Sequence, residues 1–346
     1  MSDEWEVTLA PGTEGISNVT FDPSGTSLLV SSWDAAVTLY DLQQKSLRAA
    51  FRVHSAPVLD CCYADGTRIV SAGADGFIKM VDLSTGEDTP LAVHGQPAQC
   101  VEYCATRSAV VSAGWDKQLM LSDPRQPALP PGSQQNTFNA CAPLPDKAYA
   151  LDVSADKVVV GMAGRHVYVY DVRNLSEPQQ RRESSLKYQT RCIRCMPDGT
   201  GYGLSSIEGR VAMEYFSEEP QAQAQKYAFK CHRETVDGID TVHPVNAIAF
   251  HPHHGTFATG GCDGVVNMWD GARRKRLGSQ QYSNSVASLA FSPKDSTLAV
   301  ALSYTFQHGE PKISSPSQID KLFVRRMTEQ EVLPACSSGK VPKRDF

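Results

Sequence analysis

The motif Cys192-Ile193-Arg194-Cys195 is the clearest arrangement in this sequence that could carry chemistry. Two thiols at this spacing can bind zinc or form a redox-active disulfide. The surrounding residues alternate as in a β-strand, however, and side chains three positions apart in a strand point to opposite faces. No second Cys-x-x-Cys motif or suitably spaced histidine pair completes a zinc site. We therefore expect Cys192 and Cys195 to be buried, inert side chains, and we expect no metal.

Three histidines, His251, His253 and His254, form a second group that could bind a metal ion. Similar segments elsewhere in the chain are predicted to form the turn that follows a strand. The matching turn positions there carry polar residues of several kinds, namely Asp22, Ser24, Ser292 and Lys294. A position that accepts any polar side chain is typical of a solvent-exposed turn, so we again expect no metal.

The sequence contains no motif that would support catalysis. It lacks a GxSxG nucleophile motif, a glycine-rich phosphate loop and an HExxH zinc motif. His54 and His94 each precede the first strand of a repeat, and Asp75, Asp116 and Asp263 lie in turns. We expect these residues to form hydrogen bonds within their repeats. The sequence therefore predicts a protein that is not an enzyme and that uses no cofactor.

A basic segment stands out against the rest of the chain. Residues 179–194, QQRRESSLKYQTRCIR, contain five Arg or Lys side chains and a single acid, Glu183. The whole chain has a net charge of −5. Because bulk charge does not explain this local excess of cations, we expect the segment to form a surface that recognises an anionic partner.

An internal repeat indicates the elements that position these residues. Each copy opens with small residues, passes through a turn containing Asp, Glu or Gly, and continues as an apolar strand. Six copies are clear, at residues 31–41, 71–82, 112–123, 161–171, 205–216 and 259–270. A degenerate seventh copy runs from residues 298–300 to residues 321–324. The interval of about 41 to 55 residues is close to the roughly 40–45 expected of WD-type propeller blades.

A second shared element, a strand end followed by a turn, occurs at residues 21–25, 250–255 and 291–295. Together the two elements describe a four-stranded blade, and no segment shows a sustained helical period. We predict an all-β fold with very low helix content, a seven-bladed WD-repeat β-propeller at residues 1–330. Residues 4–9 form an extra strand that we expect to complete the seventh blade and close the ring. We expect residues 331–346 to be a flexible tail.

Composition places the protein inside the cell. It is 41% hydrophobic and 21% charged, as soluble domains are. No apolar run is long enough to span a membrane, and the first residues lack a signal peptide. The ten cysteines show no spacing typical of a disulfide framework, so we expect free thiols.

Propeller topology predicts that several aromatic and basic residues share one face. The turns between second and third strands open on the same face as the connections into each first strand. Trp33 and Trp115 lie in such turns, where other copies carry smaller residues. The fifth blade and its connection to the sixth supply Arg191 (just before the first strand), Arg210, Lys230, His232 and Arg233. Because Trp and Arg are enriched at binding hot spots, we expect a protein-binding surface here.

At these residues the chain resembles a known family, the WD-repeat adaptors of the mitotic spindle-assembly checkpoint, called the Bub group. The segments that carry the resemblance cover blades one to six, at residues 31–34, 100–104, 181–194, 205–212, 227–233, 244–248 and 256–264. The resemblance weakens in a linker at residues 129–142 and again after Tyr304, where the last blade carries an insertion at residues 305–318.

The resemblance implies a non-enzymatic adaptor. Such proteins bind GLEBS segments of checkpoint kinases of the Bub group and dock them on phosphorylated Met-Glu-Leu-Thr repeats of a kinetochore scaffold. By motif, the GLEBS-binding residues would be Trp33, Trp115 and Arg191. The phosphothreonine-binding residues would be Arg210, Lys230, His232 and Arg233. Cationic side chains suit this role because a phosphate accepts charge-assisted hydrogen bonds that an unmodified threonine cannot.

The same resemblance implies a monomeric propeller that acts in hetero-complexes, the mitotic checkpoint complex among them. It implies no membrane partner and no specific nucleic acid. The expected location is the nucleus, with kinetochores in mitosis and the cytoplasm as further sites.

Two alternatives stay open. A sister group, the WD-repeat factors of messenger-RNA export, shares several of these segments and binds a GLEBS segment of a nucleoporin, although Ser185 and Tyr188 fit the checkpoint branch better. Propellers also serve as substrate receptors of ubiquitin ligases. Within the insertion, Ser314-Ser315-Pro316 matches a proline-directed phosphorylation site, but a polar loop of this kind is more often neutral.

Overall fold

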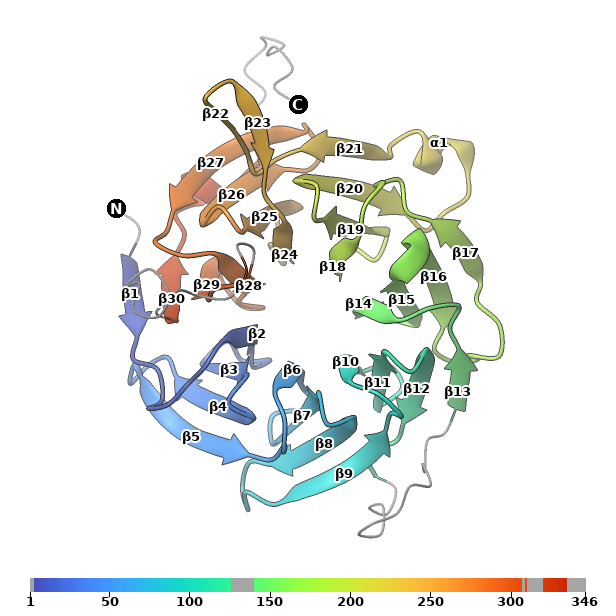
Figure 1. Cartoon of the computed structure of the whole chain (residues 1–346), viewed down its shortest axis with the longest axis vertical. Helices are drawn as coiled ribbons and strands as arrows, with labels where there is room; N and C mark the ends of the chain where they lie inside the picture. The colour runs from blue at the N-terminus through green and yellow to red at the C-terminus, as the bar shows by residue number, and fades with distance from the viewer. Residues whose placement is uncertain (1–2, 126–139, 307–308, 310–319, 335–346) are drawn as a thin grey trace.

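The computed structural model describes residues 3–125, 140–306, 309 and 320–334. These residues form seven four-stranded antiparallel sheets, arranged as blades around a central axis (Figure 1). Two short α-helices and one 3-10 turn are the only helical elements in the described part of the chain. The prediction of an all-β, seven-bladed propeller with very little helix is confirmed.

The first four blades follow one another along the chain, each running from its innermost to its outermost strand. Blade 1 contains β2 (Ile16–Phe21), β3 (Ser27–Ser32), β4 (Ala36–Asp41) and β5 (Ser46–Arg52). Blade 2 contains β6 (Val58–Tyr63), β7 (Arg68–Gly73), β8 (Phe77–Asp82) and β9 (Asp88–Val93). Blade 3 contains β10 (Ala98–Cys104), β11 (Ala109–Gly114), β12 (Gln118–Ser122) and β13 (Ala140–Pro143). Blade 4 contains β14 (Ala148–Ser154), β15 (Lys157–Met162), β16 (His166–Asp171) and β17 (Gln180–Glu183), with the 3-10 turn η1 (Ala163–Arg165) after β15.

The remaining blades complete the circle. Blade 5 contains β18 (Thr190–Cys195), β19 (Gly201–Ser206), β20 (Arg210–Tyr215) and β21 (Tyr227–Lys230), with helix α1 (Pro220–Gln223) before its last strand. Blade 6 contains β24 (Val245–Phe250), β25 (Thr256–Gly261), β26 (Val265–Asp270) and β27 (Lys275–Gln281). Blade 7 contains β28 (Val286–Phe291), β29 (Thr297–Leu302) and β30 (Lys321–Arg326), followed by helix α2 (Glu329–Val332).

The N-terminal strand closes the ring. β1 (Asp3–Val7) pairs antiparallel with β30, with Trp5 opposite Val324, and so becomes the outermost strand of blade 7. Its Val7 is buried in the core that blade 7 shares with blade 1. The predicted closure by an N-terminal strand is confirmed, and it covers the edge of β30 that would otherwise be free to pair with another chain.

Burial explains why these strands show little alternation of apolar and polar residues. All six residues of β3 and of β29 are buried, because neighbouring blades cover both faces of each second strand. The outermost strand β5 is largely exposed. Hydrophobic clusters fill the spaces between adjacent blades, as in the contact of Phe229 with Trp269, whose rings are tilted by 55° with centroids 4.7 Å apart.

Every innermost strand carries a bulge at the same place. The pairing register of each first strand shifts by one residue near its beginning, as in β18 between Thr190 and Cys192. Each bulge leaves one residue without a partner in the ladder. The seven unpaired residues are Ser17, Leu59, Gln99, Tyr149, Arg191, Asn246 and Ala287. All seven lie together around the cavity on the propeller axis, and we call them the bulge ring.

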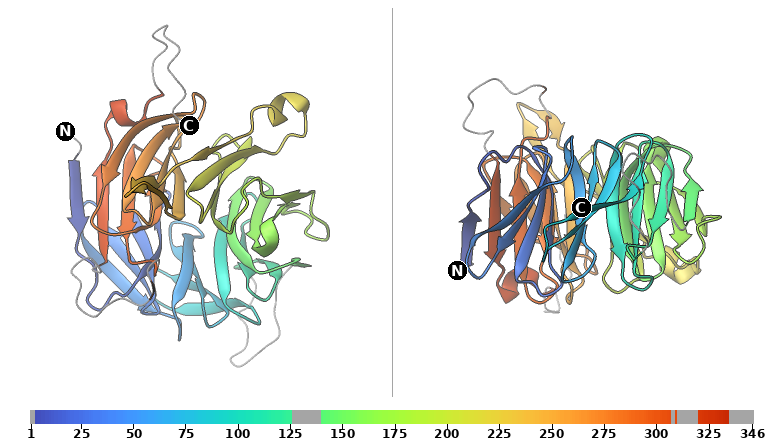
Figure 2. Two further views of the ribbon diagram at one scale, coloured as in Figure 1. Left: turned by 45° about the horizontal axis from the view of Figure 1, so that its top comes forward. Right: turned by 90° about the horizontal axis from the view of Figure 1, so that it is seen from below.

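A hairpin that the sequence analysis did not predict separates blades 5 and 6. β22 (Arg233–Val236) and β23 (Ile239–Val242) form a separate two-stranded sheet. Figure 2 shows this hairpin projecting beyond the blades on one side of the ring. Its two turn residues, Asp237 and Gly238, both have positive φ, 51° and 78°, as the tightest hairpin turns require.

The two thiols of the Cys-x-x-Cys motif lie on opposite faces of β18. Cys195 packs in the cluster between blades 4 and 5, and Cys192 packs in the cluster between blades 5 and 6. Burial raises the pKa of both thiols. The strand geometry predicted for this motif is therefore observed.

Two expectations about exposed segments need correction. Val332 in α2 is fully buried, and the Thr256 hydroxyl donates a hydrogen bond to its carbonyl oxygen at 2.8 Å. A flexible tail therefore does not begin at residue 331, because α2 packs on blade 6; residues 335–346 lie outside the described residues. His251 is also buried, and its ring stacks on His254 with centroids 4.4 Å apart. The expected solvent-exposed turn is thus wrong at His251, which packs against blade 7.

Within the described residues, no helix has the length and apolar character needed to cross a membrane.

Candidate protein-interaction surface

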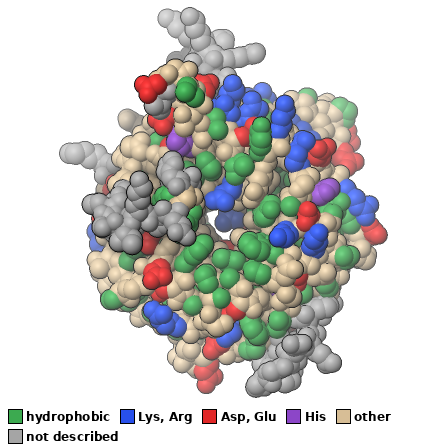
Figure 3. Space-filling model, in the orientation of Figure 1, with side chains coloured by type: hydrophobic (Ala, Val, Ile, Leu, Met, Phe, Trp, Pro, Cys, Tyr) green, Lys and Arg blue, Asp and Glu red, His purple; other side chains and the backbone are tan. Residues whose placement is uncertain are grey.

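Exposed apolar side chains gather on one face of the propeller. We call this the upper face, and define it by the turns between second and third strands and the connections into the innermost strands. Eight large hydrophobic side chains are exposed among the described residues. Six of them lie on the upper face: Trp33, Tyr188, Ile207, Ile239, Val242 and Phe306. Figure 3 looks onto this face, with hydrophobic side chains around the central opening and Lys or Arg side chains in and beside it. Such a concentration is typical of a site that binds another protein.

Trp33 lies where the sequence predicts, in the turn between β3 and β4. Its backbone N–H donates to the carbonyl oxygen of Glu14 at 2.7 Å. A Cβ atom on Gly15 would come within 3.2 Å of the indole, so glycine there leaves room for the ring. Phe306 stacks on the same indole, with ring centroids 5.7 Å apart. The turn therefore holds a half-exposed indole in a defined position.

Trp115 occupies the equivalent turn of blade 3, between β11 and β12. Its indole N–H donates to Oε1 of Gln99, a member of the bulge ring, at 3.1 Å. Lys147 Nζ lies 5.3 Å from the centre of the ring, within the range of a cation–π contact. These two contacts fix the ring, which is half-buried.

Arg191 lies within β18 as a member of the bulge ring, rather than before the strand as we expected. A bulge re-aims the side chain of its extra residue, and Arg191 lines the cavity on the propeller axis. The exposed guanidinium donates from Nη2 to Oδ1 of Asn246, the bulge residue of the next blade, at 2.9 Å. The bulge thus presents a cation at the mouth of the channel.

Arg210 and Lys230 are direct neighbours across two paired strands. Arg210 begins β20, Lys230 ends β21, and the two residues oppose each other in the register. Lys230 is exposed and Arg210 is half-buried. Neither side chain forms an ion pair with any described residue. Two adjacent cations at the rim of the upper face can together donate several charge-assisted hydrogen bonds to an anion.

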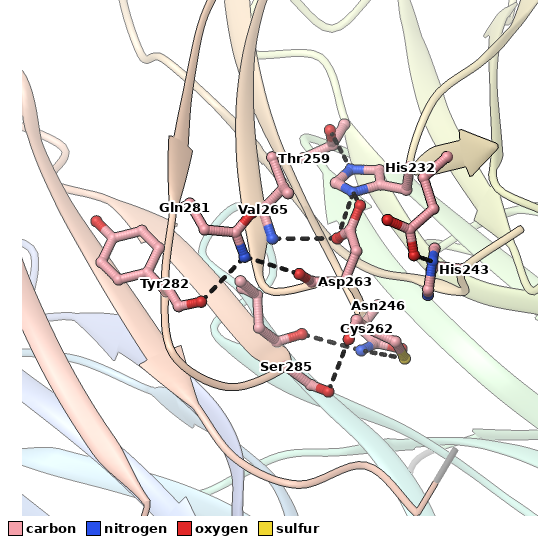
Figure 4. A network of polar contacts seen from close by, with 12 residues as sticks. His232, His243, Asn246, Thr259, Cys262, Asp263, Val265, Gln281, Tyr282 and Ser285 are labelled. Atoms are coloured by element: carbon pink, nitrogen blue, oxygen red, sulfur yellow. Dashed lines mark hydrogen bonds and ion pairs between the residues drawn. The ribbon is translucent and has the colours of Figure 1, made fainter. Parts of the chain in front are cut away.

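His232 does not belong with these cations, and its predicted role in phosphate binding needs correction. The ring is buried, and Nδ1 lies 2.9 Å from Asp263 while Nε2 lies 2.9 Å from the Thr259 hydroxyl (Figure 4). His54 and His94 make the same contacts with Asp75 and Ser71, and with Asp116 and Ser112. Both ring nitrogens of His232 are therefore engaged inside blade 6. The expected hydrogen-bond networks of His54 and His94 are observed.

Arg233 also has a different task from the one predicted. Its guanidinium donates from Nη2 to the Glu208 carbonyl oxygen at 2.8 Å and from Nε to the Gly209 carbonyl oxygen at 3.5 Å. These carbonyls belong to the turn that leads into Arg210. Arg233 therefore ties the base of the β22–β23 hairpin to that turn, and its contacts position Arg210.

The basic segment at residues 179–194 is not a single patch. Arg181 and Arg182 lie on β17 at the outside of blade 4, whereas Arg191 and Arg194 lie on β18 at the axis. Arg182 is mostly buried, 3.9 Å from Glu214. The prediction of one continuous anion-binding surface is wrong, because the segment joins the outermost strand of one blade to the innermost strand of the next.

A charged network occupies the channel beneath the bulge ring. Arg194 of blade 5 lies 3.5 Å from Glu102 of blade 3. Asp152 of blade 4 accepts a hydrogen bond from the backbone N–H of Cys195 at 2.5 Å. Burial, and then repulsion by Asp152, raises the pKa of Glu102 well above its usual range, against the opposing effect of Arg194. One cation among several buried carboxylates favours the protonated form of Glu102.

The described residues contain no group of three or more His, Cys, Asp or Glu side chains placed to hold a metal ion. Two parts of the sequence analysis fall on other residues. Ser314-Ser315-Pro316 and most of the linker at residues 129–142 lie outside the described part of the chain.

Sequence reasoning missed Phe306 and the hairpin as parts of the upper face. The hairpin had a signal, Asp237-Gly238 between two short runs of β-forming residues, which is a strong indicator of a tight turn. Phe306 had none, because its contact with Trp33 joins residues from opposite ends of the chain.

Comparison with known proteins gives a consistent result. The family model for "WD domain, G-beta repeat" matches residues 6–41, 45–82 and 226–270. The chain is 49% identical to "Mitotic checkpoint protein BUB3.1" of Arabidopsis thaliana over 94% of its own length and 93% of that protein. It is 42% identical to "Mitotic checkpoint protein bub3" of Dictyostelium discoideum, over 96% and 97%. It is 35% identical to "mRNA export factor GLE2" of Chaetomium thermophilum, over 87% and 84%.

Proposed function

Because this chain belongs to the Bub3 family of WD-repeat mitotic checkpoint proteins, we propose that it serves the spindle-assembly checkpoint as a non-enzymatic adaptor. It binds GLEBS segments of checkpoint kinases and docks them on phosphorylated Met-Glu-Leu-Thr repeats of a kinetochore scaffold. The observation that carries this proposal is that exposed apolar side chains and cations without an ion-pair partner among the described residues lie on the same face.

The GLEBS segment binds around the central opening. Trp33 and Trp115 offer indole rings held by neighbouring turns, and Arg191 offers a cation at the mouth of the channel. Aromatic and arginine side chains in such positions dominate the energetics of protein interfaces. The segment that fits this surface carries apolar side chains with acidic residues beside them.

The phosphothreonine binds at Arg210 and Lys230. The paired register sets their backbones side by side, so both side chains can reach one phosphate. Arg233 supports Arg210 through the turn at Glu208 and Gly209. Hydrogen bonds to charged groups contribute about 1.5–3 kcal/mol each, which is enough to distinguish a phosphorylated from an unmodified threonine.

The kinase-binding surface is tested with a GLEBS peptide in a calorimetric titration. Trp33→Ala and Arg191→Ala should each weaken binding by roughly 30-fold, the effect of losing about 2 kcal/mol at a hot spot. Leu47→Ala is the matched control, because Leu47 is exposed on outer strand β5, away from the upper face. Wild-type affinity in both test variants would contradict this placement of the surface.

The role in the checkpoint is tested by affinity capture from mitotic and interphase extracts. The wild-type chain should retain a kinase and a phosphorylated scaffold from mitotic extract, and Arg210→Glu should lose the scaffold but keep the kinase. The chain is then expected in the nucleus and cytoplasm, and at kinetochores during mitosis.

The second candidate function is messenger-RNA export, favoured by the 35% identity to the GLE2 export factor of Chaetomium thermophilum. In that case the bound GLEBS segment belongs to a nucleoporin. Localisation separates the two functions: the checkpoint role predicts kinetochore foci in mitosis, whereas the export role predicts a nuclear rim in interphase.

A further inference from the structure

Three aromatic rings follow one another across the junction of blades 7 and 1. The centroids of Tyr304 and Phe306 are 5.3 Å apart, and those of Phe306 and Trp33 are 5.7 Å apart. The last two planes meet at only 25°, as in a stacked pair. Phe306 is 50% exposed and Trp33 is 47% exposed, so half of this aromatic surface faces solvent.

Hydrogen bonds near these rings fix the residues that flank the insertion in blade 7. The Ser303 hydroxyl donates to Asp320 Oδ1 at 2.5 Å, and Asp320 Oδ2 accepts from the Gly15 N–H at 2.9 Å. Gly15 is the residue against which the Trp33 indole lies. The same hydrogen bonds therefore fix both the chain that leads to Phe306 and Gly15, on which the Trp33 indole lies.

Phe306 is also held in an unfavourable backbone conformation. Its φ is 57°, in the left-handed region that a bulky residue rarely adopts. Such strain persists where surrounding structure enforces it, and it concentrates at functional sites. An exposed phenylalanine that gains nothing from burial would be expected to relax away from this conformation.

We propose that Phe306 and Trp33 form one aromatic platform that receives an apolar side chain of the GLEBS segment. The start of the insertion is then part of the kinase-binding surface. This inference rests on the function proposed above. The occupant follows from charge: the exposed cations Lys147, Arg191 and Lys230 share the upper face with the platform. That combination suits a peptide whose apolar side chain is followed by acidic residues.

The platform is tested by calorimetry with the GLEBS peptide and the variants Phe306→Ala and Phe306→Tyr. Phe306→Ala should weaken binding by about tenfold, as loss of an interface aromatic does, while Phe306→Tyr keeps the ring and should stay within about twofold of wild type. Leu47→Ala again controls for loss of exposed apolar area. Because Phe306 and Trp33 touch, the double variant should lose less than the product of the two single effects.

The outcomes separate the two proposals. If the wild-type chain does not bind the peptide, the proposed function fails and the platform fails with it. If Trp33→Ala weakens binding and Phe306→Ala does not, the platform alone is overturned. Tighter binding by Phe306→Ala would also overturn it, because Phe306 would then be a cover that competes with the peptide. Unchanged melting temperatures in all variants would show that these effects arise at the surface.

Discussion

At the scale of single residues, the cations and histidines of blades 5 and 6 divide into two groups. Lys230 and Arg210 point their charge at the rim, whereas His232 and Asp263 bind each other inside the blade. Burial alone would raise the pKa of Asp263, but the hydrogen bond with His232, the charge of His232 and the backbone N–H of Val265 together lower this pKa. The first group is available to a partner, and the second holds the fold.

Replacing both rim cations should remove phosphate selectivity. Wild type is expected to bind a phosphothreonine peptide more tightly than the unmodified peptide by roughly 3 kcal/mol, from two charge-assisted hydrogen bonds less the cost of desolvation. Arg210→Ala with Lys230→Ala should abolish this difference and leave GLEBS binding unchanged. Fluorescence polarisation measures both affinities, with Lys275→Ala plus Arg276→Ala on the exposed side of β27 as the charge-matched control. Equal wild-type affinity for the two peptides would end the reader hypothesis.

His232→Ala should instead lower stability. The substitution removes the imidazole ring that hydrogen-bonds both the Asp263 carboxylate and the Thr259 hydroxyl. Loss of these two hydrogen bonds should lower the free energy of unfolding by about 2–3 kcal/mol. Urea denaturation should reveal this loss, while Lys230→Ala should unfold like wild type. A stable His232→Ala variant that fails to bind phosphopeptide would restore His232 to the binding site.

The role of His232 was hidden in the sequence for a physical reason. His54 and His94 precede their aspartates by 21 and 22 residues, but 31 residues separate His232 from Asp263. The β22–β23 hairpin lies between them and lengthens the spacing. Without that hairpin in view, the repeat could not be aligned there, and a histidine next to Arg233 resembled one more cation of the rim.

At the scale of elements, short turns stabilise the fold through hydrogen bonds to the neighbouring blade. In the turn after β24, the His253 N–H donates to Nδ1 of His251 at 3.2 Å, and Nε2 of His251 lies 3.0 Å from the Ser296 hydroxyl of blade 7. This pattern needs a lone pair on Nδ1 and therefore the neutral ring. Because the contact crosses from blade 6 to blade 7, protonation of one imidazole weakens a blade interface.

The contribution of His251 to stability should depend on pH. Burial, and then the neighbouring His254 and His253, lowers its pKa to about 4, against roughly 6.5 in an unfolded chain. Below about pH 6.5 the unfolded state gains a proton that the folded state does not. The contribution of His251 to the stability of the folded state is thus complete above about pH 6.5. It is lost progressively as the pH falls from there through the folded-state pKa of about 4. The melting temperatures of wild type and His251→Gln should converge between pH 7 and pH 4.5, and a constant gap would contradict this account.

At the scale of the whole molecule, the propeller is held together at its rim and along its axis. β1 closes the rim by pairing with β30. Inside the channel, Asn18 of blade 1 donates to Asp60 of blade 2 at 2.6 Å and accepts from Ser288 of blade 7 at 2.8 Å. The closure could be predicted from an unassigned strand in the sequence. The channel network could not, because its members contact one another only once all blades are assembled.

Removal of residues 1–8 should destabilise the closed ring. The deletion exposes the edge of β30 and the pocket of Val7, so the melting temperature should fall by roughly 4 °C, equivalent to about 3 kcal/mol. Differential scanning calorimetry provides the measurement, and removal of residues 1–2 alone is the control because it spares β1. An unchanged transition in the longer deletion would show that closure does not depend on this strand.

The bulge ring has a consequence for how such a protein changes over evolutionary time. Its seven residues line the cavity on the propeller axis, and none of them has a partner in the strand ladder. A mutation at Leu59 or Ala287 therefore alters what the mouth presents and leaves every strand pairing in place. After gene duplication, one copy can acquire a new partner through these positions while the inherited architecture is unaffected. At Leu59 and Ala287, selection for specificity can then act separately from selection for folding.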